Sequence, residues 1–125
     1  MTTRVAVVTG GIGGLGTAIC KTLAAGGRTV IAADLGSRED RIAAFAAETA
    51  GLGIRFLPLD VSDFEACGAL VAQVEAEHGR IDVLVNAAGI TRDATLRKMD
   101  KAQWDAVLSV DLHSVFHMCR HAVPG

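Results

Sequence analysis

The sequence of 125 residues contains no tyrosine and only two prolines, and its formal net charge is −2. A charge so close to neutral gives no electrostatic basis for binding nucleic acid or an anionic membrane. No apolar run approaches the roughly 18 residues of a membrane span. Strand-like sequence begins almost at the N-terminus, so we expect no signal peptide. These absences favour a cytoplasmic protein without nucleic-acid or membrane partners.

Cysteine is also scarce. Cys20, Cys67 and Cys119 are odd in number and lie far apart among apolar or helical residues. Such a set forms no disulfide framework and is typical of a reducing compartment. We interpret all three as small buried hydrophobic residues rather than nucleophiles. Hydrophobic residues make up 50% of the chain, which is enough for one domain with a real core over residues 1–125.

A glycine-rich stretch near the N-terminus organises the rest of the chain. It runs from Gly10 to Gly16, after the apolar run Arg4–Val8 and before the helical pattern Thr17–Ala25. A dinucleotide-binding fingerprint needs this order of strand, glycine loop and helix. The glycines let the backbone approach a pyrophosphate, and the helix offers free N–H groups and its positive dipole end. The alternative is a glycine-rich turn that binds nothing.

Short apolar runs alternate with helical stretches along the whole chain. Several runs are continuously apolar, which suits a parallel sheet covered on both faces, and right-handed crossovers predict the strand order 3-2-1-4. We expect an α/β fold: a Rossmann-type doubly wound parallel sheet of four strands with helices on both faces, truncated before a fifth strand. The expected strands are 4–9, 28–34, 54–59 and 81–86. The first two expected helices are 14–26 and 37–50, a third ends near residue 78, and the last runs from about residue 101 to the end.

Two patterns describe the helices of the second half. Ser62-Asp63-Phe64-Glu65 has the spacing of a capping box that opens a helix. The last helix carries an apolar stripe, whose members are Trp104, Val107, Leu108, Asp111, Leu112, Val115, Phe116 and Cys119. Asp111 interrupts this stripe, and an isolated carboxylate is costly to bury. We therefore expect Asp111 to face a polar niche.

Three separated motifs stand in order on these elements. They are the loop Thr9–Gly16, the pair Asp60-Val61 after the third strand, and the run Ile81–Gly89. Together they resemble the short-chain dehydrogenase/reductase family. The resemblance covers the whole chain, but the chain matches only the first half of the family's pattern.

The segment after these motifs resembles one subgroup of this family. Gly89–Asp93, Arg97–Met99 and residues 104–107 are similar to acetoacetyl-CoA reductases and to the related 3-oxoacyl-acyl-carrier-protein reductases. This resemblance implies NAD(P)H-dependent reduction of a 3-ketoacyl thioester, on coenzyme A or an acyl carrier, to the 3-hydroxyacyl thioester. It also implies a homo-oligomer that assembles through the last helix.

The resemblance implies a set of cofactor-binding residues. The glycine loop would hold the pyrophosphate, Asp60-Val61 would contact the adenine, and the segment after the fourth strand would border the adenosine ribose. The full set is Gly10, Ile12, Gly13, Gly14, Leu15, Gly16, Asp34, Arg38, Asp60, Val61, Asn86, Ala87, Ala88, Gly89, Ile90 and Thr91.

The sequence departs from the family's pattern in three places. Ala87 stands where the family usually has a second asparagine. Asp111 aligns with the family's catalytic asparagine, which makes it the one candidate catalytic residue; the alternative is a structural acid bonded to the loop backbone. The family's catalytic serine, tyrosine and lysine would lie beyond Gly125. Ketone reduction needs a proton donor as well as hydride. We therefore expect this chain alone to bind cofactor weakly at best and to catalyse no reduction.

Asp34 and Arg38 favour different cofactors. Asp34 ends the second expected strand, and an acid there binds the free 2′-hydroxyl of NAD and repels the 2′-phosphate of NADP. Arg38 could instead pair with that phosphate. On balance NAD(H) is slightly favoured over NADP(H).

Other polar residues leave alternatives open. A basic cluster could meet the phosphates of coenzyme A or an acidic carrier protein, or form a solvated face; it consists of Arg92, Arg97, Lys98 and Lys101. His113, His117 and His121 have the i, i+4, i+8 spacing of a metal site. No local carboxylate or cysteine completes that site, so we predict no metal and expect an interface or surface. For the whole chain, the alternatives are a non-catalytic dinucleotide-binding or interaction module and a reductase for another carbonyl compound.

Overall fold

The computed structural model describes residues 3–89 and 98–123. Four parallel strands form one sheet in the order β3-β2-β1-β4, as the sequence predicts. The strands are β1 (Val5–Thr9), β2 (Thr29–Asp34), β3 (Ile54–Pro58) and β4 (Val83–Asn86). In the register of the sheet, Val7 of β1 lies opposite Ile31 of β2 and Leu84 of β4.

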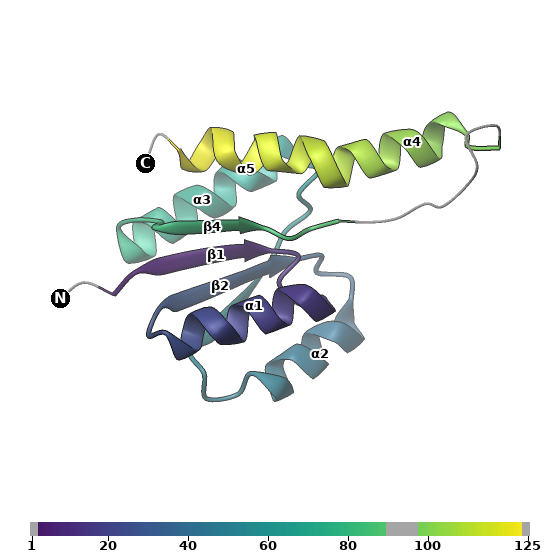
Figure 1. The fold of residues 1–125 in the computed structure, drawn as a ribbon. Coiled ribbons are helices and arrows are strands. Elements are labelled where there is room, and N and C mark those ends of the chain that lie inside the picture. Colours follow the sequence, from purple (N-terminus) through teal and green to yellow (C-terminus); the bar gives the residue numbers. More distant parts are fainter. Residues whose placement is uncertain (1–2, 90–97, 124–125) are drawn as a thin grey trace.

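Helices cover both faces of this sheet (Figure 1). One face carries α1 (Gly14–Ala25) and α2 (Glu39–Glu48), and the other carries α3 (Phe64–His78) and α5 (Ser114–Ala122). The predicted doubly wound architecture is therefore confirmed. The α5 helix packs against α3 and β4.

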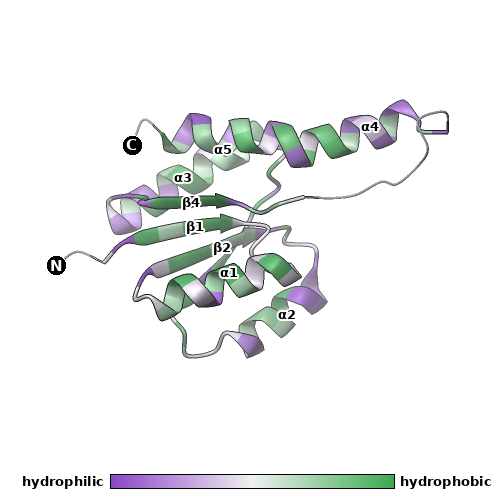
Figure 2. Ribbon diagram, in the orientation of Figure 1, coloured by the Kyte–Doolittle hydropathy of each residue, from purple (hydrophilic) through white to green (hydrophobic). Residues whose placement is uncertain are grey.

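The side chains of β1 alternate between the two faces of the sheet and pack in two separate cores. Val5 and Val7 pack with Leu70, Val71 and Val74 of α3 on one face. On the other face Val8 packs in a second cluster, whose other buried members are Ile12, Cys20, Val30, Ala32 and Phe45. Because strand residues alternate between faces and both faces are covered, β1 is buried throughout. Figure 2 shows the strands mostly in the hydrophobic colour and the helices with hydrophilic residues among the hydrophobic ones.

The start of α3 corrects the predicted capping box. The N-cap is Asp63, whose carboxylate accepts a hydrogen bond from the Ala66 N–H at 3.1 Å. The Ser62 hydroxyl instead donates to the Asp60 carboxylate at 2.6 Å. Both side chains have cap chemistry, and the tight turn after β3 decides which one reaches the helix. The predicted end of the helix is confirmed, since Gly79 adopts φ +83° there.

The last helical segment differs from a plain α-helix. It consists of α4 (Lys101–Val107), a π-helical turn η1 (Leu108–His113) and α5. In the described part of the segment, Ser114 and Met118 are buried, whereas Leu112 and Phe116 are 60% and 61% exposed. A π-helical turn breaks the 3.6-residue repeat that the stripe pattern assumes. The predicted apolar stripe is therefore not the face that α5 turns towards this chain's core.

Two further observations bear on the sequence predictions. Cys20 and Cys67 lie fully buried in the two cores, as expected, and Cys119 is partly buried. Within residues 3–89 and 98–123, no helix combines the length and apolarity that crossing a bilayer requires.

Candidate cofactor site

A pocket lies at the carboxyl ends of the strands, the edge at which open α/β sheets bind their ligands. Its volume is about 150 Å³, and loops after β1, β2, β3 and β4 contribute to its wall. The lining residues are Gly10, Gly13, Asp34, Leu35, Arg38, Leu59, Asp60, Val61, Ala87, Ala88, Gly89 and Val110. The fold thus brings together residues from all the predicted cofactor motifs.

Glycine is required at two positions of the first loop for different reasons. Gly10 adopts φ +66°, and a Cβ there would lie 2.7 Å from the backbone of Ala88. A Cβ on Gly16 would lie 2.0 Å from the carbonyl oxygen of Gly10. The backbone of the loop therefore packs directly against the end of β4 and the first turn of α1. The predicted approach of this loop to a pyrophosphate stays a prediction.

The N-terminus of α1 opens beside this pocket. Its N-cap, Gly13, has no side chain, and the first turn contains no acidic residue. The bond from the Thr17 N–H to the Gly13 carbonyl is 2.8 Å long, and the N–H groups before it have no intrahelical acceptor. A Cβ on Gly14 would meet nothing within 4 Å. Uncapped amides at the positive end of a helix dipole fit a pyrophosphate.

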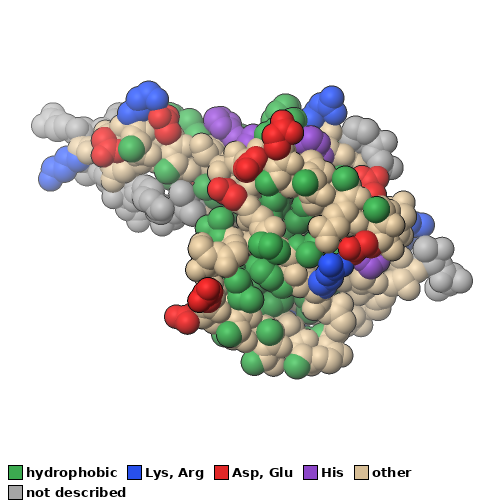
Figure 3. Space-filling model, turned by 180° about the vertical axis from the view of Figure 1, so that it is seen from behind, with side chains coloured by type: hydrophobic (Ala, Val, Ile, Leu, Met, Phe, Trp, Pro, Cys, Tyr) green, Lys and Arg blue, Asp and Glu red, His purple; other side chains and the backbone are tan. Residues whose placement is uncertain are grey.

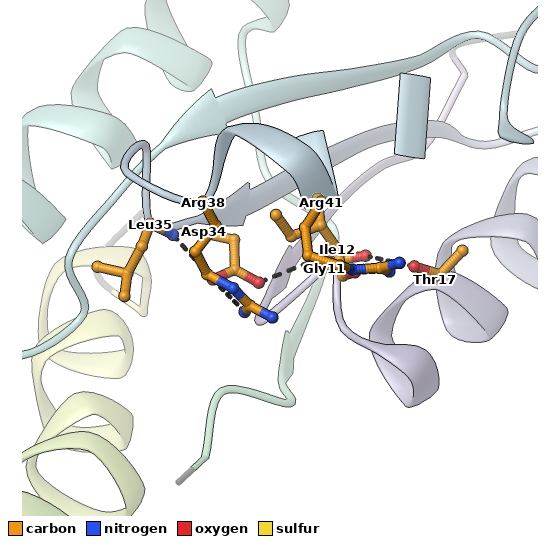
Figure 4. A network of polar contacts seen from close by, with 7 residues as sticks. All are labelled: Gly11, Ile12, Thr17, Asp34, Leu35, Arg38 and Arg41. Atoms are coloured by element: carbon orange, nitrogen blue, oxygen red, sulfur yellow. Dashed lines mark hydrogen bonds and ion pairs between the residues drawn. The ribbon is translucent and has the colours of Figure 1, made fainter. Parts of the chain in front are cut away.

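Asp34 joins the glycine loop to the start of α2, as Figure 4 shows. It is only 8% exposed. One carboxylate oxygen accepts the Leu35 N–H at 2.8 Å and faces the Arg38 guanidinium at 3.5 Å. The other accepts the Ile12 N–H at 3.4 Å. The two residues expected to favour opposite cofactors therefore form one ion pair at the wall of the pocket.

A turn after β3 forms the next part of the wall. The Leu59 N–H donates to the Asp34 carbonyl at 2.7 Å, which ties this turn to the end of β2. The Asp60 carboxylate accepts the Ser62 N–H at 3.0 Å, and the Asp60 carbonyl accepts the Asp63 N–H at 3.0 Å. Asp60 and Val61, both predicted to contact adenine, line the pocket in this turn.

The segment after β4 completes the wall. The Ala87 N–H donates to the Thr9 carbonyl at 3.2 Å, so the missing asparagine side chain at position 87 does not prevent backbone pairing there. Asn86 is not among the residues that line the pocket, and its amide donates to the Cys119 sulfur at 3.9 Å. Its buried Oδ1 has no hydrogen-bond partner among the described residues. Ile90 and Thr91 lie outside the described residues.

Some predicted residues are not part of the pocket wall. The Ile12 side chain is fully buried in the core beside α1, and its backbone bonds both Asp34 and the guanidinium of Arg41. Gly14, Leu15 and Gly16 belong to the first turn of α1, where Leu15 is 72% exposed. Their contact with a cofactor stays a prediction.

The sequence reasoning missed several pocket residues. Leu35 and Leu59 line the pocket directly beside the predicted Asp34 and Asp60, so chain adjacency was the available signal. Val110 comes from η1, and no local pattern points to it. Arg41, one turn after Arg38 on α2, lies outside the pocket wall, but its guanidinium bonds the Ile12 carbonyl across 29 positions of sequence.

Asp111 lies on η1 at the rim of the site. The residue is exposed, and one of its carboxylate oxygens is 3.5 Å from the point where a Cβ on Gly89 would stand. Its predicted catalytic role stays a prediction. Of the basic cluster, Arg92 and Arg97 lie outside the described residues, and Lys101 pairs with Asp105 at 2.5 Å.

The described histidines and cysteines are, by residue type, candidate metal ligands or nucleophiles. Among the described residues there is no group of three or more His, Cys, Asp or Glu side chains that could hold a metal. His117 and His121 bond backbone carbonyls at the start of α3, at Val61 and Phe64. Burial raises the pKa of Cys20 to about 11, and burial together with Asp63 and Asp60 raises that of Cys67 to about 11. Both thiols are protonated near neutral pH and are poor nucleophiles.

The fold and the pocket define a class: a Rossmann-type α/β domain in which a glycine loop, an acid at the end of β2 and a turn after β3 converge on one pocket. Residues 4–125 match the short chain dehydrogenase family. The chain belongs to this family of oxidoreductases, whose members generally use NAD(P).

Individual relatives agree with this assignment. The chain is 48% identical to nodulation protein G of Azospirillum brasilense, covering 99% of this chain and 51% of the relative. It is 45% identical to an acetoacetyl-CoA reductase of Allochromatium vinosum, and the match covers 98% of this chain and 50% of that reductase. Among solved structures, a short-chain dehydrogenase/reductase (glucose/ribitol dehydrogenase) from Brucella melitensis has a TM-score of 0.87 at 32% identity. The match covers 99% of this chain and 54% of that structure's chain. The chain thus spans about half the length of the curated relatives it matches.

Proposed function

We propose that this chain is the cofactor-binding half of an NAD(P)H-dependent reductase that converts a 3-ketoacyl-CoA, such as acetoacetyl-CoA, to the 3-hydroxyacyl-CoA. The observation that carries the proposal is the convergence of Gly10, Asp34, Asp60 and Ala88 on one pocket beside the uncapped N-terminus of α1. The substrate class is supported by the acetoacetyl-CoA reductase of Allochromatium vinosum, at 45% identity.

Each part of the pocket has a separate role in this proposal. The amides at the start of α1 bind the pyrophosphate, Asp34 orients the adenosine ribose through its hydroxyls, and Asp60-Val61 borders the adenine. A bound nicotinamide cofactor would supply hydride to the ketone carbon. We propose that Asp111, whose carboxylate lies near Gly89, holds a water there, although its charge disfavours a developing alkoxide beside it. Since the chain has no tyrosine, we propose weak cofactor binding and no reduction by this chain alone.

The preference for NAD(H) follows from the pairing of Asp34 with Arg38. Arg38 lies 3.5 Å from Asp34, so its charge is already partly balanced by that carboxylate. A 2′-phosphate placed at Asp34 would meet a like charge on a residue that is only 8% exposed. The ribose 2′-hydroxyl of NAD would instead donate a hydrogen bond to the same carboxylate.

An alternative function is a non-catalytic dinucleotide-binding or interaction module. The absence of tyrosine favours it for this chain taken alone. Both functions include self-association through the last helix, for which the exposed side chains of Trp104, Leu112 and Phe116 provide an apolar surface. Sedimentation of Phe116→Glu beside the unsubstituted chain tests this association, and an unchanged oligomeric state would exclude that surface.

The test of the function uses the oxidation of NADH and NADPH with acetoacetyl-CoA, together with calorimetric binding of both cofactors. We expect no turnover, binding of NADH that is weaker than micromolar, and still weaker binding of NADPH. Clear turnover would show that a residue of this chain replaces the missing proton donor. Turnover or binding only with another carbonyl compound would reject the 3-ketoacyl-CoA assignment.

A matched pair of variants separates binding from folding. Gly13 is an N-cap with extended backbone, where aspartate is preferred, so Gly13→Asp should preserve folding while placing a carboxylate where the pyrophosphate would lie. Leu15→Asp adds the same charge at an exposed position two residues later, in the first turn of α1. We expect Gly13→Asp to abolish cofactor binding and Leu15→Asp to weaken it only partly. Equal effects would indicate long-range electrostatics rather than a pyrophosphate site.

A further inference from the structure

One helix far along the sequence reaches the turn that borders the predicted adenine position. The ring of His117 on α5 lies with Nδ1 2.8 Å from the carbonyl oxygen of Val61. Because a carbonyl oxygen only accepts, Nδ1 carries the hydrogen and donates it. The two residues are 56 positions apart in sequence. This bond ties the adenine turn to a helix that packs over α3.

The His117 ring is held in place on more than one side. Its centroid lies 5.4 Å from that of Phe64, in an edge-to-face arrangement, and 6.1 Å from that of Phe116. Seen from behind, histidine side chains lie at the top of the molecule, with acidic side chains just below them (Figure 3). A ring packed in this way keeps its donor aimed at one acceptor with little loss of side-chain freedom.

His121 provides an internal comparison on the same helix face. Its Nε2 lies 3.2 Å from the carbonyl oxygen of Phe64, and its ring lies 4.4 Å from the Phe64 ring. Phe64 opens α3 and does not line the pocket, whereas Val61 does. Both histidines therefore join α5 to the start of α3, but only His117 bonds a residue of the candidate site.

Among residues 3–89 and 98–123, the Val61 carbonyl has one other donor. The Cys67 thiol lies 3.6 Å from it, and a thiol is a weak donor. Val61 itself is 6% exposed, so water offers little replacement for a lost partner. Removal of the imidazole would leave a buried carbonyl with a single weak bond, and the turn would become easier to open.

We propose that His117 is a positioning residue for the cofactor site, which fixes the Asp60–Ser62 turn through the Val61 carbonyl and thereby sets the adenine-binding surface. The part that concerns the adenine rests on the proposed function. The part that concerns the turn does not, since the bond exists without any ligand.

The experiment compares His117→Phe, His117→Asn and His121→Phe in the full chain. Phenylalanine keeps a ring and removes the donor. The side-chain amide nitrogen of asparagine is the same number of bonds from Cα as Nδ1 of histidine. His117→Asn therefore restores the donor without the ring. His121→Phe removes the equivalent bond to α3 outside the pocket. Thermal unfolding shows whether the two phenylalanine variants lose similar stability.

The first readout needs no cofactor. Amide hydrogen exchange of Ser62 and Asp63, whose N–H groups bond Asp60, should be about tenfold faster in His117→Phe. It should be close to normal in His117→Asn and in His121→Phe. Unchanged exchange in His117→Phe, or equal acceleration in His121→Phe, overturns the proposal whatever the chain binds.

The second readout is the affinity for AMP and for NADH. We expect His117→Phe to weaken both about three- to tenfold, with recovery in His117→Asn and little change in His121→Phe. An unsubstituted chain that binds neither ligand contradicts the proposed function, while the exchange data still decide the role of His117. Faster exchange with unchanged affinity overturns the link between His117 and the cofactor.

Discussion

At the scale of single residues, Gly14 and Gly16 show how two neighbouring glycines of one helical turn can have different reasons to be there. A Cβ on Gly16 would lie 2.0 Å from a backbone oxygen, whereas one on Gly14 would meet nothing within 4 Å. Both belong to α1, and their sequence context alone does not distinguish them. The close packing of the glycine loop against the helix makes the difference.

This contrast predicts opposite effects of the same substitution. Gly16→Ala should destabilise the fold by more than about 2 kcal/mol, because the backbone contact leaves no room for a methyl group. Gly14→Ala should be neutral or stabilise the fold by up to about 1 kcal/mol through helix propensity. Urea unfolding of both variants measures the difference. Equal free energies of unfolding would show that the loop does not pack on α1 as described.

Asp34 supports a second prediction at this scale. Asp34→Asn removes the charge while keeping an acceptor for the Ile12 or Leu35 N–H. The ratio of NADPH to NADH affinity should rise about tenfold, equivalent to about 1.4 kcal/mol. Calorimetric titration with both cofactors checks it. Asp40→Asn is the control, since Asp40 lies on α2 outside the pocket wall; an equal change there would mean that net charge alone sets the preference.

At the scale of elements, the start of α3 illustrates how the structure selects between two suitable caps. Ser62 and Asp63 are adjacent, and the sequence pattern favoured the serine. The turn after β3 uses Ser62 to bond Asp60 and leaves Asp63 at the N-cap. The backbone path through the turn, and not the residue type, decides which of two adjacent residues becomes the N-cap.

The cap assignment has a direct test. Asp63→Ala should lower the free energy of unfolding by about 1 kcal/mol, because the Ala66 N–H loses its acceptor. Ser62→Ala should have a smaller effect, since it removes a bond in the turn rather than a helix cap. Chemical denaturation followed by circular dichroism measures both. A larger loss in the serine variant would restore the capping box predicted from the sequence.

At the scale of the whole molecule, Asp82 joins the start of β4 to the start of β1. Its carboxylate accepts the Val5 N–H at 2.7 Å and pairs with the guanidinium of Arg80. The hydrogen bond from Arg80, followed by the one from Val5, lowers the pKa of Asp82 below its usual 3.8. A carboxylate with a lowered pKa stabilises the folded state above its unfolded pKa, and this stabilisation is lost as the pH falls through the folded pKa.

Asp82→Asn should therefore destabilise the fold in a pH-dependent way. The variant should have a lower unfolding midpoint than the unsubstituted chain at pH 6, and the difference should shrink as the pH falls below about 4. Thermal unfolding at several pH values measures this. Asp105→Asn, which breaks the exposed pair between Lys101 and Asp105 on α4, is the control and should change little. A difference for Asp82→Asn that is constant from pH 6 to pH 3 would contradict the assignment.

Much of this fold could be predicted because its signals are local. Continuous apolar runs such as Val5–Val8 and Val30–Ala33 marked strands buried on both faces, and the crossover rule ordered them. The last helix could not be predicted in the same way. A stripe shows that a helix has an apolar face, but it does not identify the neighbour, and here Ser114 and Met118 face the core while Phe116 stays exposed.

The sequence alone determined the order of strands and the positions of the glycine loop, Asp34 and Asp60-Val61. The strands follow from apolar runs ordered by the crossover rule, and the other positions follow from short motifs. The tertiary structure alone decided that Asp34 bonds Ile12 and Arg38 at once, and that His117 reaches Val61. Such contacts depend on where separate elements meet in space, because a hydrogen bond is made over about 3 Å between groups that the chain can separate by any number of residues.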